Sequence, residues 1–350
     1  MVALIVIDLI ASGCASGGDV LVPGSQAGSK SLTGAGATFP APLYQLWAEK
    51  YRQVTGVKVN YQAIGSGGGI QQITARTVDY GASDAPMKDD ELAEAPGPIL
   101  HIPIVFGGVV VTYNLSGVAS GLRLTPDAVA GVFLGRIKRW NDPAIASLNA
   151  GAVLPASEIS VVHRSDGSGT TNIFTAYLSD VSEEWKTEAG SGKEVEWPTG
   201  VGGKGNDGVA ALVKQLPGSL GYVELAYAQQ NGMPTAALRN QAGSFMMSDL
   251  ASITAAAATV AVPEDLRFSV VNAPGADAYP IVGATWLLVY REQADRAKAT
   301  TLVNFLWWAV HDGQRYAEPL LYATLPTSLV MKVEAKIRSI AFRGAPLGIR

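Results

Sequence analysis

Short apolar runs alternate along the chain with segments in which apolar residues recur at helical spacing. The apolar runs predict strands at 57–64, 99–113, 159–162 and 281–290. Within residues 40–54, Leu43, Trp47 and Tyr51 fall on one face, which predicts an amphipathic helix. Further helices are expected at 69–75, 128–134, 170–178, 208–215, 251–261, 300–312 and 328–340. This alternation is typical of α/β architecture.

Length and composition narrow the class of protein. The 350 residues suggest two domains, at about 100–200 residues for each. Hydrophobic residues make up 48% and charged residues 16%, a balance typical of a packed globular chain. A net charge of −4 disfavours nucleic acid as a partner, because such proteins need a positive surface. One cysteine and three scattered histidines, His101, His163 and His311, predict no disulfide framework, metal site or cofactor.

The amino terminus carries features of an export signal. Residues 2–10 are apolar except for Asp8, and this stretch is far shorter than the roughly 20 residues of a membrane-spanning helix. Small residues at 11–13 precede Cys14, as at the processing site of a bacterial lipoprotein signal peptide, although no Lys or Arg precedes the stretch. We therefore expect a periplasmic protein, anchored through lipidation of Cys14. Residues 15–30 are Gly/Ser-rich and predict a flexible tether.

Three turns rich in Gly or Ser lead directly into predicted helices, at 32–40, 64–69 and 163–171. A helix amino terminus offers unpaired N–H groups and a partial positive charge, and glycines let the backbone approach an anion closely. Thr38 and Phe39 precede the first of these helices, and Ser66 is a candidate N-cap of the second. One such turn is more often a simple cap, but three together predict a site for an oxyanion.

Other residues narrow the kind of anion. Arg164, in the third turn, carries a fixed fork of donors that matches a tetrahedral oxyanion. The turns lack the third glycine of the dinucleotide fingerprint, and the lysine within 199–208 is not followed by Ser or Thr, so nucleotide binding is not expected. The run 199–208 is interpreted as a structural turn in which Asn206 or Asp207 caps the next helix.

Longer motifs in a fixed order point to one family. They are T-G-A-G-A-T-F-P-A-P at 33–42, G-S-G-G-G at 65–69, G-A-S-D-A-P at 81–86, R-S-D-G-S-G-T at 164–170, W-P-T-G-V-G-G-K-G-N-D-G at 197–208 and G-Y-V-E at 221–224. From residue 32 onward the chain resembles the substrate-binding protein of bacterial ABC-type phosphate uptake systems, in the type II periplasmic binding protein family. The amino terminus is the main departure from the family pattern.

The resemblance implies a two-lobed α/β fold, in which each lobe is a mixed β-sheet flanked by helices and hinge strands cross the cleft between them. The implied segments are a signal and tether at 1–30, a first lobe at 31–108 and 280–350, a second lobe at 113–275, and hinges near 109–112 and 276–279. A monomer would capture one phosphate in the cleft and deliver it to the membrane permease and ATPase subunits of an ABC transporter.

The resemblance also implies the phosphate ligands. Backbone amides and hydroxyls would hold the phosphate together with a guanidinium, from Thr38, Phe39 and Ser66 on one lobe and Arg164, Ser168, Gly169 and Thr170 on the other. Asp166 would orient Arg164 through an ion pair.

Asp84 would supply selectivity. At neutral pH phosphate still carries a proton, so it can donate a hydrogen bond to a carboxylate, whereas sulfate carries no proton. A buried Asp84 facing sulfate would meet lone pairs and like charge. Sites built on one required hydrogen bond can reject an analogue lacking it by about 10⁴–10⁵.

Two alternatives stay open at this point. The first is a binding protein for another oxyanion, such as sulfate, molybdate or a phosphonate. The second is a phosphate-ester hydrolase that uses Ser168 with His163. We do not expect an enzyme, because a nucleophile elbow needs Gly where the chain has Asp166, and His163 lies on the same short strand end as Ser168.

Overall fold

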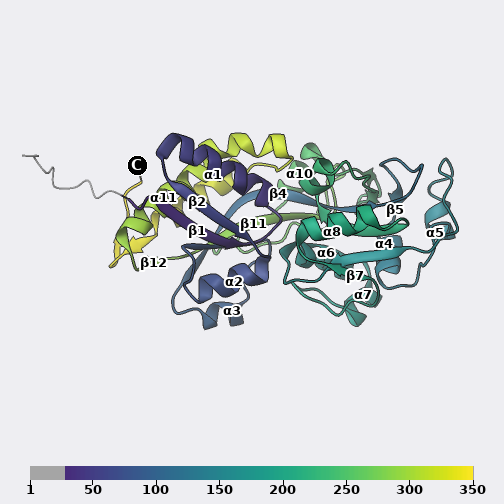
Figure 1. The fold of residues 1–350 in the computed structure, drawn as a ribbon, viewed down its shortest axis with the longest axis horizontal. Coiled ribbons are helices and arrows are strands. Elements are labelled where there is room, and N and C mark those ends of the chain that lie inside the picture. The colour runs from purple at the N-terminus through teal and green to yellow at the C-terminus, as the bar shows by residue number, and fades with distance from the viewer. Residues whose placement is uncertain (1–27, 350) are drawn as a thin grey trace, which may run out of the picture.

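An eight-stranded mixed sheet runs through both halves of the molecule in the order β2-β1-β3-β11-β4-β8-β6-β7. We describe residues 28–349 of a computed structural model. Figure 1 shows an elongated shape in which the first and last parts of the chain form one half and the middle of the chain forms the other. The strands are β1 (Ser31–Gly36), β2 (Lys58–Ala63), β3 (Tyr80–Ser83), β4 (Ile99–Tyr113), β6 (Ser160–Arg164), β7 (Val201–Gly203), β8 (Ser219–Glu224) and β11 (Val282–Tyr290).

The long strand β4 is shared by the two halves. Its first part, up to Gly108, pairs antiparallel with β11, and its last part, from Val109, pairs antiparallel with β8. The outer strands on each side are parallel to one another, β2-β1-β3 in the first half and β8-β6-β7 in the second. The sheet therefore changes partners along β4 between Gly108 and Val109. The lobe and hinge limits inferred from the sequence stay predictions.

Helices flank the sheet in both halves (Figure 1). In the first half they are α1 (Ala41–Thr55), α2 (Ser66–Thr74), α3 (Asp89–Glu94), α11 (Arg296–Val310), α12 (Thr327–Arg338) and the 3-10 helices η1 (Asp312–Tyr316) and η2 (Glu318–Leu320). The middle of the chain contributes α4 (Pro126–Phe133), α5 (Pro143–Ala146), α6 (Gly169–Val181), α7 (Glu183–Glu188), α8 (Gly205–Gln215), α9 (Leu225–Gln230) and α10 (Leu250–Ala257). Two small sheets contain β5 (Arg123–Leu124), β9 (Ala237–Arg239) and β10 (Phe245–Met246), and β12 (Glu292–Gln293), β13 (Ala341–Phe342) and β14 (Ala345–Pro346).

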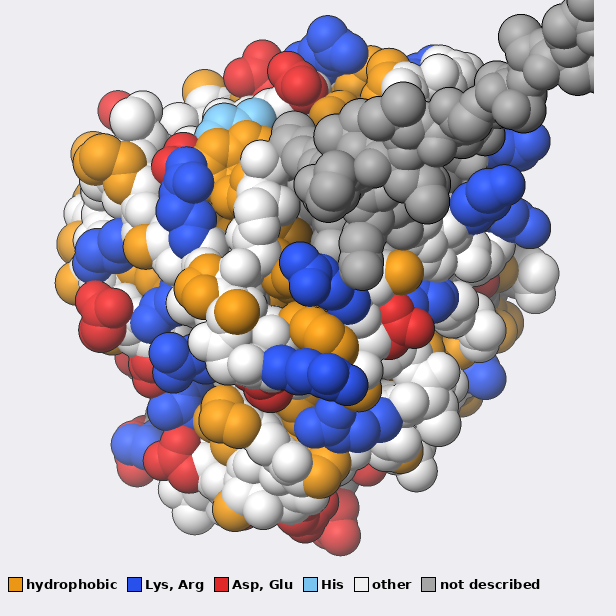
Figure 2. All heavy atoms as spheres, turned by 90° about the vertical axis from the view of Figure 1, so that its left-hand side faces the viewer, with side chains coloured by type: hydrophobic (Ala, Val, Ile, Leu, Met, Phe, Trp, Pro, Cys, Tyr) orange, Lys and Arg blue, Asp and Glu red, His pale blue; other side chains and the backbone are white. Residues whose placement is uncertain are grey.

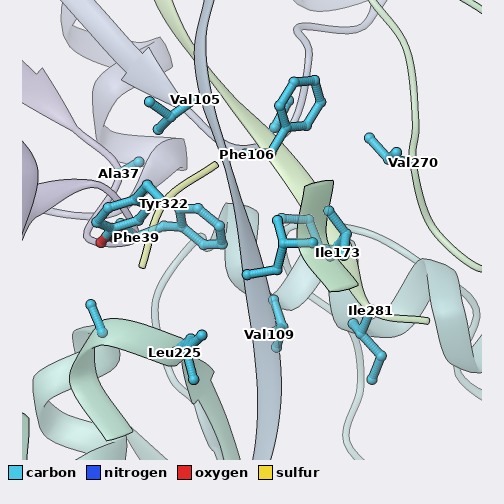
Figure 3. Packing of buried hydrophobic residues seen from close by; sticks show 14 of the residues in the cluster. Ala37, Phe39, Val105, Phe106, Val109, Ile173, Leu225, Val270, Ile281 and Tyr322 are labelled. Carbon is cyan, nitrogen blue, oxygen red and sulfur yellow. Dashed lines mark hydrogen bonds between the residues drawn. The ribbon is translucent and has the colours of Figure 1, made fainter. Parts of the chain in front are cut away.

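The hydrophobic core continues from one half into the other along β4. Figure 3 shows Val105, Phe106 and Val109 on this strand, with Leu225 and Ile281 packed nearby. All five side chains are buried. In the helix predicted at 300–312, the aromatic side chains Phe305 and Trp308 are buried, as expected of core residues.

Four strands of the sheet, β1, β3, β7 and β8, lie outside the four predicted strand ranges, and β7 falls in the run 199–208 that was interpreted as a turn. Their sequences are SLTGAG, YGAS, VGG and SLGYVE, in which glycine and small residues break the apolar runs. Glycine has a low strand propensity by itself. A Cβ at Gly34 would lie 2.1 Å from the Tyr80 ring, so the neighbouring strand needs this glycine. Tertiary packing therefore decides these strands.

The surface at the end of the first half carries both basic and hydrophobic side chains (Figure 2). Viewed from the end of the first half, Lys and Arg side chains gather near the centre of the face and hydrophobic side chains occur in small groups (Figure 2).

Among residues 28–349 no helix is long and apolar enough to cross a membrane. Within the same range no group of His, Cys, Asp or Glu could hold a metal ion. Cys14 lies outside the described residues, and Ser29 already donates a hydrogen bond to the Ala297 carbonyl of α11 (3.0 Å), before the predicted end of the tether.

Candidate anion-binding site

The first turn places Thr38 and Phe39 between β1 and α1, where the two halves meet. Both residues are buried, and Pro40 is the N-cap of α1 with no side-chain cap bond. The Thr38 carbonyl accepts a hydrogen bond from the Ala41 amide (3.1 Å), which closes the turn. The Thr38 hydroxyl lies at the boundary between the halves, where it accepts a hydrogen bond from the Asn206 side-chain amide of the second half (2.9 Å).

Ser66 begins α2, but the prediction that it caps this helix is wrong. The N-cap is Gly65, whose φ of +91° lies in a region that favours glycine. The Ser66 hydroxyl instead accepts hydrogen bonds from the amides of Gly169 (3.0 Å) and Asp84 (3.2 Å). One buried hydroxyl thus joins α2, the end of β3 and the start of α6, because the turn at Gly65 leaves the serine facing the second half.

The third turn starts α6 against the first half. Ser168 is the N-cap, and its hydroxyl accepts a hydrogen bond from the Thr171 amide (3.0 Å) while its own amide donates to the Lys193 carbonyl (2.9 Å). A Cβ on Gly169 would come within 2.5 Å of the Ser66 hydroxyl oxygen and 2.6 Å of the Asp84 Cβ. Glycine is therefore required for this close approach.

Arg164, at the end of β6, has a fixed orientation. Its Nε and Nη2 donate to the two carboxylate oxygens of Asp166, at 2.8 and 2.6 Å, and its side chain is 1% exposed. Burial alone would raise the pKa of Asp166, but the hydrogen bonds and charge of Arg164 hold it below its ordinary value. Nη1 remains directed toward the Thr170 hydroxyl, 3.4 Å away. The predicted ion pair is thus present.

Asp84 directly follows β3 and is 2% exposed. Its Oδ1 accepts a hydrogen bond from the Thr285 hydroxyl of β11 (2.8 Å), and its Oδ2 lies 3.5 Å from the Ser66 hydroxyl. Burial raises the pKa of Asp84 to about 7, against the lowering effects of the Thr285 hydrogen bond, the Arg164 charge and Ser66. The sequence offered no signal for Thr285, which lies within an apolar strand.

Asn206 contacts two of the predicted ligands, although its segment was expected to be a structural turn. Its side-chain amide donates to the hydroxyls of Thr38 (2.9 Å) and Thr170 (3.1 Å), and its side-chain oxygen accepts from the Glu224 amide (2.8 Å). The expected capping role is wrong, because α8 starts at Gly205 with Lys204 as N-cap and no side-chain cap bond. The available signal was the family motif at 197–208, which ends just after this asparagine.

Glu224, the last residue of β8, is a second buried carboxyl near the site. Its Oε2 accepts a hydrogen bond from the Ala226 amide (2.9 Å) and lies 3.0 Å from the Tyr322 hydroxyl. Its Oε1 has no hydrogen-bond partner among residues 28–349. Burial raises the pKa of Glu224 well above its ordinary value, which favours the neutral acid.

His163 and Ser168 each contact other residues of the described chain. The His163 ring stacks on Trp197, with 4.7 Å between ring centroids, and its Nδ1 lies 2.9 Å from the Arg164 carbonyl. The Ser168 hydroxyl accepts the capping hydrogen bond of α6. Burial also lowers the pKa of His163.

The structure therefore brings the predicted residues of both halves together. Hydroxyl groups, amides and one guanidinium converge beside a buried carboxyl. The charges of Arg164 and Asp166 oppose each other, so the neutralisation of a bound anion would fall mainly to hydroxyl and amide dipoles. Such an arrangement can hold a small oxyanion that also donates a hydrogen bond to Asp84.

Comparison with known proteins agrees with this geometry. Residues 21–312 match the model of a PBP superfamily domain. The chain is 48% identical over 312 residues to the phosphate-binding protein PstS of Pasteurella multocida, covering 88% of this chain and 90% of that protein. The identity to the PstS protein of Xylella fastidiosa strain 9a5c is 45%, over 93% of this chain and 90% of that one. This chain belongs to the PstS family of the PBP superfamily.

Solved structures show the same fold. A high affinity periplasmic phosphate-binding protein (PfluDING), bound with phosphate, has a TM-score of 0.71 at 23% identity, over 87% of this chain and 93% of that one. The phosphate-binding protein of Stenotrophomonas maltophilia has a TM-score of 0.70 at 20% identity, over 88% and 94%. The predicted two-lobed α/β fold is confirmed.

Proposed function

We propose that this PstS-family chain captures inorganic phosphate in the cleft between its lobes and delivers it to an ABC permease for import. The observation that carries the proposal is the convergence of Asp84, Arg164 and the hydroxyls of Thr38, Ser66 and Thr170 from opposite halves. This set combines donors for a tetrahedral anion with one acceptor for its proton. The names of the relatives support the same ligand.

The proposed ligands follow from the sequence and from this placement. Amides and hydroxyls donate to the phosphate together with the Arg164 guanidinium, from Thr38, Phe39, Ser66, Arg164, Ser168, Gly169 and Thr170. Asp84 accepts a hydrogen bond from the protonated oxygen of phosphate, and Asp166 holds Arg164 in place through two short hydrogen bonds. Asn206 joins the Thr38 and Thr170 hydroxyls and so orients groups from both halves.

The proposed transport cycle is a lobe closure. The lobes are 31–108 with 280–350 and 113–275, and the hinges lie near 109–112 and 276–279. The change of partner along β4 at Gly108 and Val109 supports a hinge at this point. Contacts between the halves, including the 2.5 Å ion pair of Lys193 with Glu91, stabilise the closed arrangement, which the permease would recognise.

Competition between phosphate and sulfate tests the proposed ligand. Wild-type protein should bind phosphate in titration calorimetry with sulfate in excess, because sulfate cannot donate a hydrogen bond to Asp84. Asp84→Asn should retain measurable phosphate binding and gain sulfate binding, because an amide can donate to sulfate. Asp79→Asn, which alters a partly buried carboxylate paired with Lys298 (2.9 Å), is the matched control and should behave as wild type.

Two results of this titration would count against the proposal. Wild-type binding of sulfate in preference to phosphate would favour a carrier for another oxyanion. Selectivity that is unchanged in Asp84→Asn would remove Asp84 from the proton-sensing role.

The remaining proposals concern the setting of this function. The chain acts as a non-catalytic monomer, with the permease and ATPase subunits of a phosphate transporter as partners. A phosphomonoester assay should show no phosphate release, whereas turnover would support the hydrolase alternative. We also propose a periplasmic location with lipidation of Cys14, and mass spectrometry of the mature amino terminus tests this.

A further inference from the structure

Three tyrosine hydroxyls bind three successive carbonyls of the first site turn. Tyr61 donates to the Ala37 carbonyl (2.6 Å), Tyr227 to the Thr38 carbonyl (2.6 Å) and Tyr322 to the Phe39 carbonyl (2.7 Å). The three tyrosines come from β2, from α9 and from the segment after η2. Residues distant in the sequence thus converge on one short backbone stretch.

These hydrogen bonds determine how the turn presents its amides. The described chain has no cis peptide bond, and in a trans peptide the C=O and the N–H of one unit point in opposite directions. Holding the Ala37 carbonyl therefore fixes the Thr38 N–H, and holding the Thr38 carbonyl fixes the Phe39 N–H. These are the two amides that the proposed function assigns to the anion.

The tyrosines differ in the half from which they come. Tyr61 and Tyr322 lie in the same half as the turn, and Figure 3 shows Tyr322 next to Phe39. Tyr227 lies in α9, which packs with α8 and β8 in the other half. Its bond to the Thr38 carbonyl, like the bond of Asn206 to the Thr38 hydroxyl, crosses the boundary.

We propose that Tyr61, Tyr227 and Tyr322 are positioning residues that aim the Thr38 and Phe39 amides at the bound anion, with Tyr227 doing so only when the lobes are closed. This inference rests on the proposed phosphate function and adds to it a link between closure and ligand binding. When α9 separates, the Thr38 carbonyl loses the Tyr227 hydrogen bond and keeps only the one from the Ala41 amide (3.1 Å), so the Phe39 amide is held less firmly.

The hydroxyls remain protonated donors over the working range of pH. Burial raises the pKa of Tyr227, and it also raises the pKa values of Tyr61 and Tyr322. A phenylalanine at each position keeps the ring and removes only the donor. The substitution Tyr→Phe therefore isolates the proposed positioning role from packing.

Stopped-flow measurement of phosphate binding tests the inference in the full chain. Tyr227→Phe should raise the phosphate dissociation rate about tenfold while the association rate stays within about twofold, because the bond forms after encounter and is worth on the order of one neutral hydrogen bond. Tyr61→Phe should weaken phosphate binding through the association rate as well, because its bond is present before closure.

The matched control is Tyr290→Phe, which removes a tyrosine hydroxyl that donates to the Thr74 carbonyl (3.2 Å) within the first half. It should leave both rates unchanged. Thermal unfolding without phosphate should give equal midpoints for wild type and Tyr227→Phe. A purely structural role would instead lower the unfolding midpoint and leave the phosphate dissociation rate unchanged.

The outcomes separate this inference from the function on which it rests. Phosphate binding by wild type with unchanged dissociation from Tyr227→Phe overturns the inference alone. If Tyr227→Phe changes the association and dissociation rates by equal factors, the inference is also overturned, because a bond that forms only on closure should change the dissociation rate alone. Absence of phosphate binding by wild type overturns the proposed function and the inference together.

Discussion

Replacement of Asp84 by asparagine should remove a large pH-dependent contribution to the stability of the phosphate-free protein. The pKa of Asp84 is raised from 3.8 to about 7 by burial, which the surrounding hydrogen bonds and Arg164 oppose only in part. Folding therefore favours the protonated carboxyl. The shift of the Asp84 pKa from 3.8 to about 7 is a roughly thousand-fold change in proton affinity, which corresponds to about 4 kcal/mol.

The sign follows from proton binding in the two states. Between pH 4 and pH 7 the folded protein holds a proton on Asp84 that the unfolded chain has released, so the free energy of unfolding falls as pH rises. The contribution is complete below about pH 4 and is lost above about pH 7. An asparagine carries no such proton, so Asp84→Asn lacks this slope.

Urea unfolding of phosphate-free protein from pH 4 to pH 8 measures the effect. The unfolding free energy of wild type minus that of Asp84→Asn should decrease by about 4 kcal/mol across this range. In the control Asp265→Asn the same difference should be constant, since burial of Asp265 is outweighed by hydrogen bonds from Arg267 that hold its pKa below the ordinary value. A constant difference for Asp84→Asn would refute the burial of a neutral carboxyl at this position.

Three further substitutions test other parts of the site. Arg164→Ala should weaken phosphate binding about 10–100-fold in titration calorimetry, because charged hydrogen bonds are lost, and unchanged affinity would remove Arg164 from the site. Asn206→Ala should weaken it about tenfold by freeing the Thr38 and Thr170 hydroxyls, and equal affinity would reduce Asn206 to a structural role. In urea unfolding, Glu224→Gln should gain stability relative to wild type as pH rises from 5 to 9, because burial raises the pKa of Glu224 and wild type loses stability as pH rises. Parallel curves of unfolding free energy against pH for the two proteins would contradict a neutral Glu224 carboxyl.

Much of the site was predictable because its segments carry local signals. Glycine and serine turns ahead of helices predicted an oxyanion site, and the spacing of apolar residues predicted β4 and α1 almost to their ends. Arg164 was recognised in the third turn, and family motifs a few residues long implied Asp84 and Gly169. Each of these signals depends on backbone propensity or residue type within a short window.

The partners within the site were decided by the tertiary structure alone. Ser66 was expected to cap its own helix, but its hydroxyl accepts a hydrogen bond from the Gly169 amide. Asn206 donates a hydrogen bond to the Thr38 hydroxyl across the boundary between the halves. β1 and β8, in which glycine interrupts the apolar run, form strands only through pairing with their neighbours. The sequence by itself therefore determined which chemical groups are available and which backbone turns carry them. The path of the chain decided which groups meet, because a hydrogen bond between residues 100 or more positions apart leaves no mark on the local pattern of either partner.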